Sequence, residues 1–253
     1  KNVSAVAWRD GGPKKDIWGN SQNGGVVKNW RDGDGYVWSD EEFRFTGFVG
    51  LKTWTVKMSY PIFTSPYSGI TIDLKDGAFD RSTGRQLRDR PIRLVNFAGL
   101  CDHGSDTGTT SAVKNYMGIT DLSCGYWGLE PPGYANVHFV GEKYYTFARA
   151  GVISHFMNTI RKADLNVVTA EWVGFGHRID VGRATRARSI YAGVDPFALD
   201  YWGAKHLILP HSKNGDNHDP DNPQSAVGRF LRFGSEHIGY DVLDDSLITV
   251  HES

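Results

Sequence analysis

The fold is decided by two adjoining stretches, IRLVNFAGL at Ile92–Leu100 and DHGSDTGTTSAVKNYMG at Asp102–Gly118. The first is an apolar run that predicts a buried strand. The second begins with a polar turn carrying two glycines and continues into a predicted helix at Thr109–Met117. Strand ends and helix N-termini converge at such a junction, where α/β proteins place their ligands. This order of elements therefore predicts an α/β fold and the position of a site.

The chain from Pro91 onward continues the alternation of strands and helices. Asp195-Pro196 supplies an N-cap and a first-turn proline for one of these helices. The alternation predicts a mixed, partly parallel sheet flanked by helices. The predicted strands are Ile92–Leu100, Leu165–Ala170, Arg188–Gly193 and Leu247–His251, and the later helices are Ala150–Lys162, Pro196–Leu207 and Ser225–Phe233.

The first ninety residues have a different pattern. Glycine-containing turns separate short aromatic and β-branched runs, and the alternation of Trp54, Val56, Met58 and Tyr60 is typical of a strand. We predict a β-rich, irregular N-terminal region at residues 1–90, packed on an α/β domain at residues 91–253.

Composition and charge exclude several classes of protein. A net charge of −1, with 40% hydrophobic and 23% charged residues, is ordinary for a globular chain and argues against a nucleic-acid partner. The densest basic run holds Arg183, Arg186 and Arg188, which we interpret as a solvated face or internal ion pairs. No apolar run is long enough to predict a membrane span.

The cysteines leave two alternatives open. Cys101 and Cys124 could form a disulfide in an oxidising compartment, or both could be buried thiols. Without a Cys-x-x-Cys pair, an iron–sulfur cluster held by this chain is not expected. The start at Lys1 fits a processed protein, which predicts an extracytoplasmic (periplasmic or secreted) location, although a trimmed chain would begin in the same way.

The polar residues of the first block form the main candidate site. His103 is a candidate metal ligand or general acid/base, and Lys114 a catalytic cation. Asp106 is a candidate metal ligand. The candidate substrate-binding residues are Thr109, Thr110 and Asn115.

Three further groups of carboxylates and imidazoles are candidates. Glu171 and His177 follow a predicted strand, as metal ligands or as parts of a turn. Asp195 is either a metal ligand or a helix cap, and Asp200, among large apolar neighbours, is a candidate catalytic carboxylate. The segment Asp216–Asn222 could hold Ca²⁺ or form a hydrophilic loop. Imidazole with carboxylates suits Zn²⁺, Mn²⁺ or Fe²⁺.

Three blocks of the sequence together resemble the family called domain of unknown function 362. They are Leu94–Gly118 with its TGTTSAVKNYMG ending, Ala163–Gly174, and Ile190–Lys205 with its Asp-Pro-Phe-Ala-Leu-Asp core. The resemblance implies an α/β domain and marks His103, Lys114, Asn115, Asp195 and Asp200 as matching family motifs. The pairing of the first block with the Asp195–Asp200 block predicts that Asp102–Gly118 is one half of a two-part site. The resemblance implies no particular reaction.

Two functions fit these observations. The first is an exported enzyme, metal-assisted or not, acting on a small polar or anionic substrate at the carboxyl ends of the strands. The second is a non-catalytic binding or accessory subunit of an extracytoplasmic assembly, a redox assembly included. Its contact anchors would be the N-terminal tryptophans Trp8, Trp18, Trp30, Trp38 and Trp54, whose alternative role is ordinary packing. The sequence does not fix the oligomeric state.

Overall fold

The computed structural model describes residues 27–47, 53–119, 137, 140, 144–175, 183–239 and 243–251. The chain divides into two compact units. We call the first the β unit, and it comprises Lys1–Arg93, Met117–Val140 and Asn158–Lys162. The second, the α/β unit, comprises Leu94–Tyr116, Gly141–Met157 and Ala163–Ser253.

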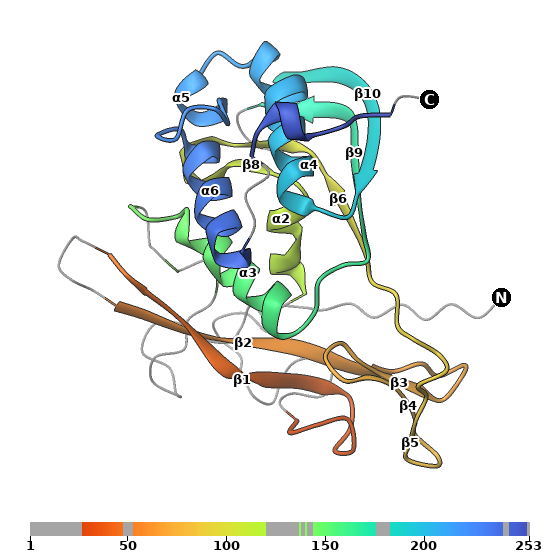
Figure 1. Cartoon of the computed structure of the whole chain (residues 1–253). Helices are drawn as coiled ribbons and strands as arrows, with labels where there is room; N and C mark the ends of the chain where they lie inside the picture. Colours follow the sequence, from red (N-terminus) through yellow and green to blue (C-terminus); the bar gives the residue numbers. More distant parts are fainter. Residues whose placement is uncertain are drawn as a thin grey trace. The chain divides into compact units, whose positions relative to one another are not determined.

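The β unit contains a five-stranded antiparallel sheet in which each strand pairs with the next along the chain (Figure 1). The side chains that alternate along its second strand, from Trp54 to Tyr60, are buried. The predicted β-rich N-terminal part is therefore confirmed. Its strands are β1 (Gly35–Thr46), β2 (Thr53–Thr64), β3 (Ile70–Asp73), β4 (Gly77–Asp80) and β5 (Arg85–Gln86).

Two of the N-terminal tryptophans are core residues. Trp30 is buried and stacks on Phe79, with ring centroids 4.4 Å apart. Trp54 is buried too and stacks on Phe45 at 5.6 Å. Their predicted role as exposed contact anchors is wrong, because burial in the β unit removes their surface from a partner. Trp38 is half-buried, and Trp8 and Trp18 lie outside the described residues.

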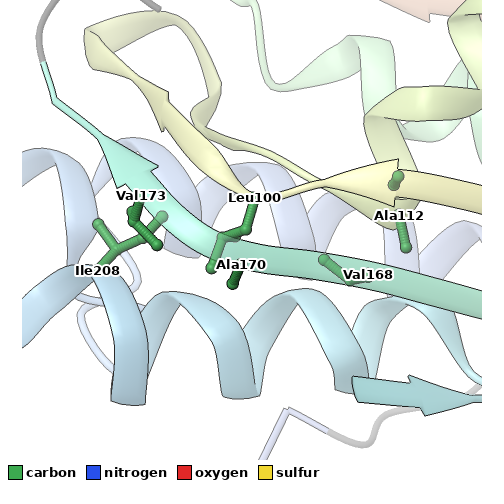
Figure 2. Packing of buried hydrophobic residues seen from close by; sticks show 7 residues of the cluster. Leu100, Ala112, Val168, Ala170, Val173 and Ile208 are labelled. Carbon is green, nitrogen blue, oxygen red and sulfur yellow. The ribbon is translucent and has the colours of Figure 1, made fainter. Parts of the chain in front are cut away.

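The α/β unit is built on a three-stranded sheet in the order β10-β9-β6. Strand β6 (Val95–Gly99) runs parallel to β9 (Leu165–Gly174), and β10 (Ala184–Gly193) runs antiparallel to β9. This confirms the predicted mixed, partly parallel sheet. Figure 2 shows a cluster of buried apolar side chains in this unit, among them Leu100, Val168 and Ile208.

The helices of this unit cover one face of the sheet (Figure 1). The predicted Asp195 cap is confirmed, since its Oδ1 accepts the N–H of Phe197 at 2.8 Å. On the other face Phe97 and Ile190 are largely exposed. No helix within the described ranges combines the length and apolar character of a membrane span. The helices are α2 (Ala112–Asn115), α3 (Ala148–Thr159), α4 (Pro196–Gly203), continued by the π-helical turn Ala204–Ile208, and α6 (Ala226–Ile238).

The helix predicted at Thr109–Met117 begins later than expected. Strands β7 (Cys101–His103) and β8 (Gly108–Thr110) form a hairpin around the short helix α1 (Gly104–Thr107), and α2 starts only at Ala112. Gly104 and Gly108 adopt φ values of +58° and +69°, which favour glycine and close the hairpin.

The strand predicted at Leu247–His251 is also wrong. This segment begins in the 3₁₀ turn Asp245–Leu247. Asp244 caps the turn, its Oδ1 accepting the N–H of Ser246 at 2.9 Å. The capped turn starts the segment in a helical conformation, and residues 248–251 pair with none of the described strands.

Candidate functional site

A cleft of about 890 Å³ opens at the carboxyl ends of the parallel strands of the α/β unit. Asp102 and Gly104 line it just beyond β6, and Phe175 lines it directly after β9. Its opposite wall is the segment from His211 to His218. The position agrees with the expectation that a site lies at this edge of the sheet.

Three side chains in the cleft form one hydrogen-bonded chain. The Nε2 atom of His218 lies 2.6 Å from Oδ1 of Asp102, and Nδ1 of the same ring contacts the hydroxyl of Ser212. Asp102 and His218 are buried, and Ser212 is half-buried at the cleft wall. The order hydroxyl, imidazole, carboxylate is that of a catalytic triad.

Short elements hold each member of this chain. Alternation along β7 turns Asp102 inward, where Oδ1 also accepts the N–H of Gly104 at 2.6 Å. The hydroxyl of Ser212 accepts the N–H of Asn214 at 3.0 Å. His218 ends the helix α5 (Gly215–His218), and the ring of Phe175 meets its imidazole edge-on at 6.2 Å.

The glycine at position 108 allows α5 to approach the β7–β8 hairpin. A Cβ atom at Gly108 would lie 2.4 Å from the backbone oxygen of Asn217, the residue before His218. Only a residue without a side chain fits at that distance, so the hairpin and the histidine can be neighbours.

The partners of the His218 ring fix its tautomer. A carboxylate can only accept, so Nε2 carries the proton that is donated to Asp102. In the neutral ring Nδ1 is then left with a lone pair that accepts the hydroxyl proton of Ser212. This is the arrangement in which an imidazole can act as a general base toward a serine hydroxyl.

Apart from Asp102, the charged side chains that the structure describes on the cleft wall are basic. Arg183 and Lys213 line the cleft, and the carboxylate of Asp102 is engaged by His218 and Gly104. The amides of Asn214 and Asn217 add neutral hydrogen-bonding groups. The wall therefore favours a substrate that carries negative charge and hydrogen-bonding oxygens.

Three of the predicted site residues lie on the hairpin, outside the residues that line this cleft. Thr110 places its hydroxyl 3.1 Å from Nδ1 of His103. Thr109 is buried, and its hydroxyl donates to the carbonyl oxygen of Cys101 at 3.3 Å. The two threonines thus bond within the hairpin, and their roles in substrate binding stay predictions.

Helix α2 holds two more of the predicted residues. Lys114 is buried. Asn115 donates to Oδ1 of Asn96 at 2.6 Å, and Asn96 donates in turn to Asn166 at 2.9 Å across the parallel strands. These amides tie α2 to the sheet, which is a structural role.

Asp200 joins the two sequence blocks that we expected to meet. It is fully buried, and its oxygens accept the N–H groups of Ala112 at 2.8 Å and Val113 at 2.9 Å. Burial raises its pKa to about 7, and the negative charge of Asp195 acts in the same direction, while the hydrogen bonds from the N–H groups of α2 oppose the shift. The position makes Asp200 the cap of α2, and its catalytic role stays a prediction.

The predicted metal ligands that the structure describes do not form a metal-binding group. Asp106 is exposed and lies 3.9 Å from the guanidinium of Arg149, while Glu171 is exposed and pairs with Arg186 at 2.7 Å. Asp195 caps α4, and His177 lies outside the described residues. In the part of the chain that the structure describes, no three His, Cys, Asp or Glu side chains are grouped so that they could hold a metal.

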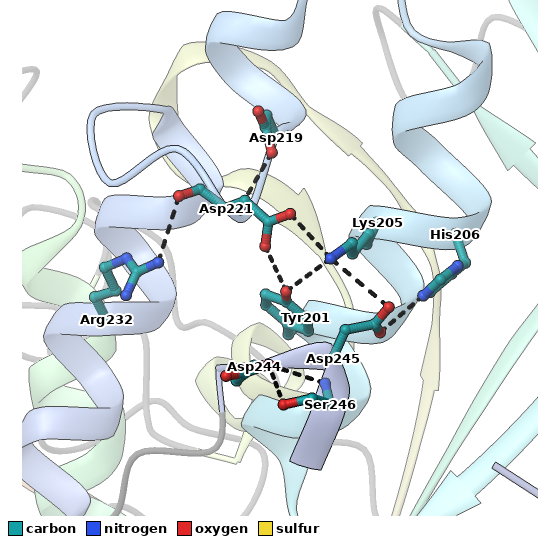
Figure 3. Close-up of polar contacts among 9 residues, drawn as sticks. All are labelled: Tyr201, Lys205, His206, Asp219, Asp221, Arg232, Asp244, Asp245 and Ser246. Atoms are coloured by element: carbon teal, nitrogen blue, oxygen red, sulfur yellow. Dashed lines mark hydrogen bonds and ion pairs between the residues drawn. The ribbon is translucent and has the colours of Figure 1, made fainter. Parts of the chain in front are cut away.

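Two aspartates of the loop considered for Ca²⁺, Asp219 and Asp221, make hydrogen bonds and an ion pair with protein groups (Figure 3). Oδ1 of Asp219 accepts the N–H of Asp221 at 3.0 Å. The carboxylate of Asp221 contacts the hydroxyl of Tyr201 and lies 2.9 Å from Nζ of Lys205. These bonds lower the pKa of Asp221, with the tyrosine the largest cause. The carboxylate of Asp221 is therefore paired with the ammonium of Lys205.

Sequence reasoning missed Asp102, Ser212 and His218 as a group. Asp102 and His218 are 116 residues apart, and no short motif joins them. The available signals were local: an aspartate beside the noted His103 in a polar turn, and a histidine within the Asp216–Asn222 segment. The inward direction of both side chains is set by elements of three and four residues, too short for periodicity to predict.

Comparisons of this chain with protein-family models, with curated proteins and with solved structures found no match. The resemblance to domain of unknown function 362 stays a prediction, and the chemistry of the cleft rests on its own geometry.

Proposed function

We propose that the α/β unit is an acyl-transfer enzyme that hydrolyses an ester or thioester of a small anionic molecule. The observation that carries the proposal is the chain from Ser212 through His218 to Asp102 at the wall of the cleft. A reaction carried out by these three side chains needs no metal ligands. The alternative role as a non-catalytic subunit loses support, because Trp30 and Trp54 are buried.

In the proposed reaction the Ser212 oxygen attacks the substrate carbonyl while Nδ1 of His218 takes the hydroxyl proton. The carbonyl carbon then releases its alkoxide or thiolate, which receives that proton from the imidazolium. Water repeats the sequence on the acyl-enzyme, releasing the carboxylic acid and restoring the serine. Asp102 orients the ring and stabilises its positive charge throughout.

The proposal is tested with a fluorophosphonate, which phosphonylates activated serines. We expect the wild-type protein to gain one phosphonyl group, located on Ser212 by peptide mass spectrometry, because the hydroxyl donates to an imidazole. Ser212→Ala should lose the label. The matched control Ser105→Ala removes an exposed hydroxyl elsewhere in the unit and should label as wild type does.

Absence of any label on Ser212, under conditions in which a known serine hydrolase reacts completely, would overturn the proposal. So would a label that persists undiminished in the Ser212→Ala protein. Circular dichroism of each variant shows that it is folded.

The positive wall predicts a preference for anionic acyl groups. The measurement is the ratio of kcat/KM for the anionic ester 4-nitrophenyl hydrogen succinate to kcat/KM for the neutral ester 4-nitrophenyl acetate. We expect Lys213→Gln to lower this ratio by about fivefold, because a charge-assisted contact contributes roughly 1 kcal/mol or more. Lys205→Gln is the matched control: its ammonium pairs with Asp221 and Asp245, and the residue is outside the cleft lining. Equal ratios in wild type and Lys213→Gln would remove Lys213 from substrate selection.

A further inference from the structure

A second cavity, of about 1070 Å³, lies along the outer edge of β10. It is bounded by residues 188–194 of that edge, by α4, and by the C-terminal segment Leu247–His251. None of the residues that line the cleft with Ser212 lines this cavity. It is therefore a separate feature of the α/β unit.

A bulge in β10 places an arginine at this cavity. The pairing with β9 shifts between Arg186 and Ser189, so that two residues of β10 stand opposite Glu171 alone. Arg188, the second of them, has φ +50° and is the non-glycine residue with positive φ in the described chain. Bulges re-aim side chains at functional sites, and a strained backbone is kept where the surroundings require it.

The guanidinium of Arg188 makes no hydrogen bond or ion pair with the residues that the structure describes, whereas Arg186 on the same strand is paired with Glu171. The cavity also contains Asp195, but Oδ1 of that carboxylate accepts the N–H groups of Phe197 and Ala198. Among the described residues, the cavity thus presents a cation with no protein anion bonded to it.

The rest of the cavity offers apolar side chains that the protein leaves in water. Val194, directly after β10, is 66% exposed, and Leu247 of the C-terminal segment is 64% exposed. Trp202 of α4 also lines the cavity, with its ring 5.2 Å from that of Tyr191. Exposed apolar side chains beside the guanidinium of Arg188 fit a ligand that has a negatively charged group and an apolar chain.

We propose that this cavity binds an amphipathic carboxylate, with the carboxylate at Arg188 and the apolar chain between Val194 and Leu247. The inference goes beyond the proposed hydrolysis and does not depend on it, because no residue is shared. It accounts for the bulge, the unpaired guanidinium and the exposed apolar wall together.

The test uses octanoate as the probe and isothermal titration calorimetry as the measurement, with octan-1-ol as the uncharged analogue. We expect wild type to bind octanoate at least fivefold more tightly than octan-1-ol, because only the carboxylate pairs with Arg188. Arg188→Gln should weaken octanoate binding about tenfold and leave octan-1-ol binding unchanged. Arg188→Lys keeps the charge and should recover most of the affinity.

Arg186→Gln is the matched control, two residues away on the same strand and outside the cavity lining, and should bind octanoate as wild type does. Leu247→Ser should weaken both ligands several-fold. No binding of octanoate at up to about 10 mM would overturn the proposal. Equal affinity of wild type and Arg188→Gln for octanoate would also overturn it. Labelling of Ser212 measured on the same proteins keeps this result apart from the proposed hydrolase function.

Discussion

Replacing His218 by glutamine is expected to lower the rate at which Ser212 reacts with a fluorophosphonate by about a thousandfold or more. Glutamine keeps polar atoms in the same space but cannot accept the hydroxyl proton at neutral pH, so the serine loses its base. The measurement is the second-order rate of phosphonylation, followed by intact mass.

Removing the imidazole is also expected to lower the stability of the folded protein. Asp102 would stay buried and keep its bond from the N–H of Gly104, but it would lose the bond from His218, a change that costs about 1–3 kcal/mol. Urea unfolding of the variant separates this loss from the loss of reactivity. The rate comparison is made well below the unfolding midpoint.

Non-additivity gives a stronger control. If His218 and Asp102 act as one unit on Ser212, the double variant Asp102→Asn/His218→Gln should react no more slowly than His218→Gln by itself. A His218→Gln protein that reacts within tenfold of the wild-type rate would show that the serine is not activated by this histidine.

The second large effect is expected at Asp200, as a dependence of stability on pH. Its folded pKa of about 7 exceeds the usual aspartate value of 3.8, because burial disfavours the charged form. The folded state therefore binds the proton more tightly than the unfolded chain. Asp200 makes its full contribution to the free energy of unfolding below about pH 4. This contribution is lost as the pH rises through 7, at up to about 1.4 kcal/mol per pH unit.

Asp200→Asn tests this expectation. The amide has an N–H₂ group where one carboxyl oxygen now accepts a backbone N–H of α2, so the variant should be less stable by about 1–3 kcal/mol. This deficit applies near pH 4, where wild-type Asp200 is protonated in the folded state. Because asparagine does not titrate, wild type should lose up to about 4 kcal/mol relative to the variant between pH 4 and pH 8, so that the variant becomes the more stable protein at pH 8. Urea unfolding at intervals across this range measures the difference.

Asp195→Asn is the matched control at the start of the same helix. Asparagine caps helices about as well as aspartate, so this variant should lose less than about 0.5 kcal/mol. A difference between wild type and Asp200→Asn that stays constant from pH 4 to pH 8 would show that the buried carboxyl does not take up a proton in this range.

Asp200 also shows how far a sequence pattern reaches. The pattern predicted that the first block and the Asp195–Asp200 block lie together, and the bonds from Ala112 and Val113 to Asp200 join them. It also predicted a catalytic role, which stays a prediction. In the structure both oxygens of the carboxylate accept backbone N–H groups. These hydrogen-bond partners lie 88 and 87 residues away in the sequence, so no local pattern predicts them.

The three arginines of one short run illustrate the same limit. By spacing they are a single basic segment, for which a solvated face or internal ion pairs was predicted. In the structure Arg183 lines the cleft, Arg186 pairs with Glu171, and Arg188 is turned to the second cavity by a bulge. A bulge shifts side chains between faces, so the regular alternation of a strand fails where it occurs.

The sequence by itself determined the elements whose signals are local. The apolar run of β6, the Asp195-Pro196 cap of α4 and the alternation along β2 are each complete within a dozen residues, because helix and strand periodicity and capping act over short distances. The tertiary structure alone decided the site. Asp102, Ser212 and His218 meet because a three-residue strand, a turn and a one-turn helix are packed together by the chain's path, and contacts between distant residues depend on that path.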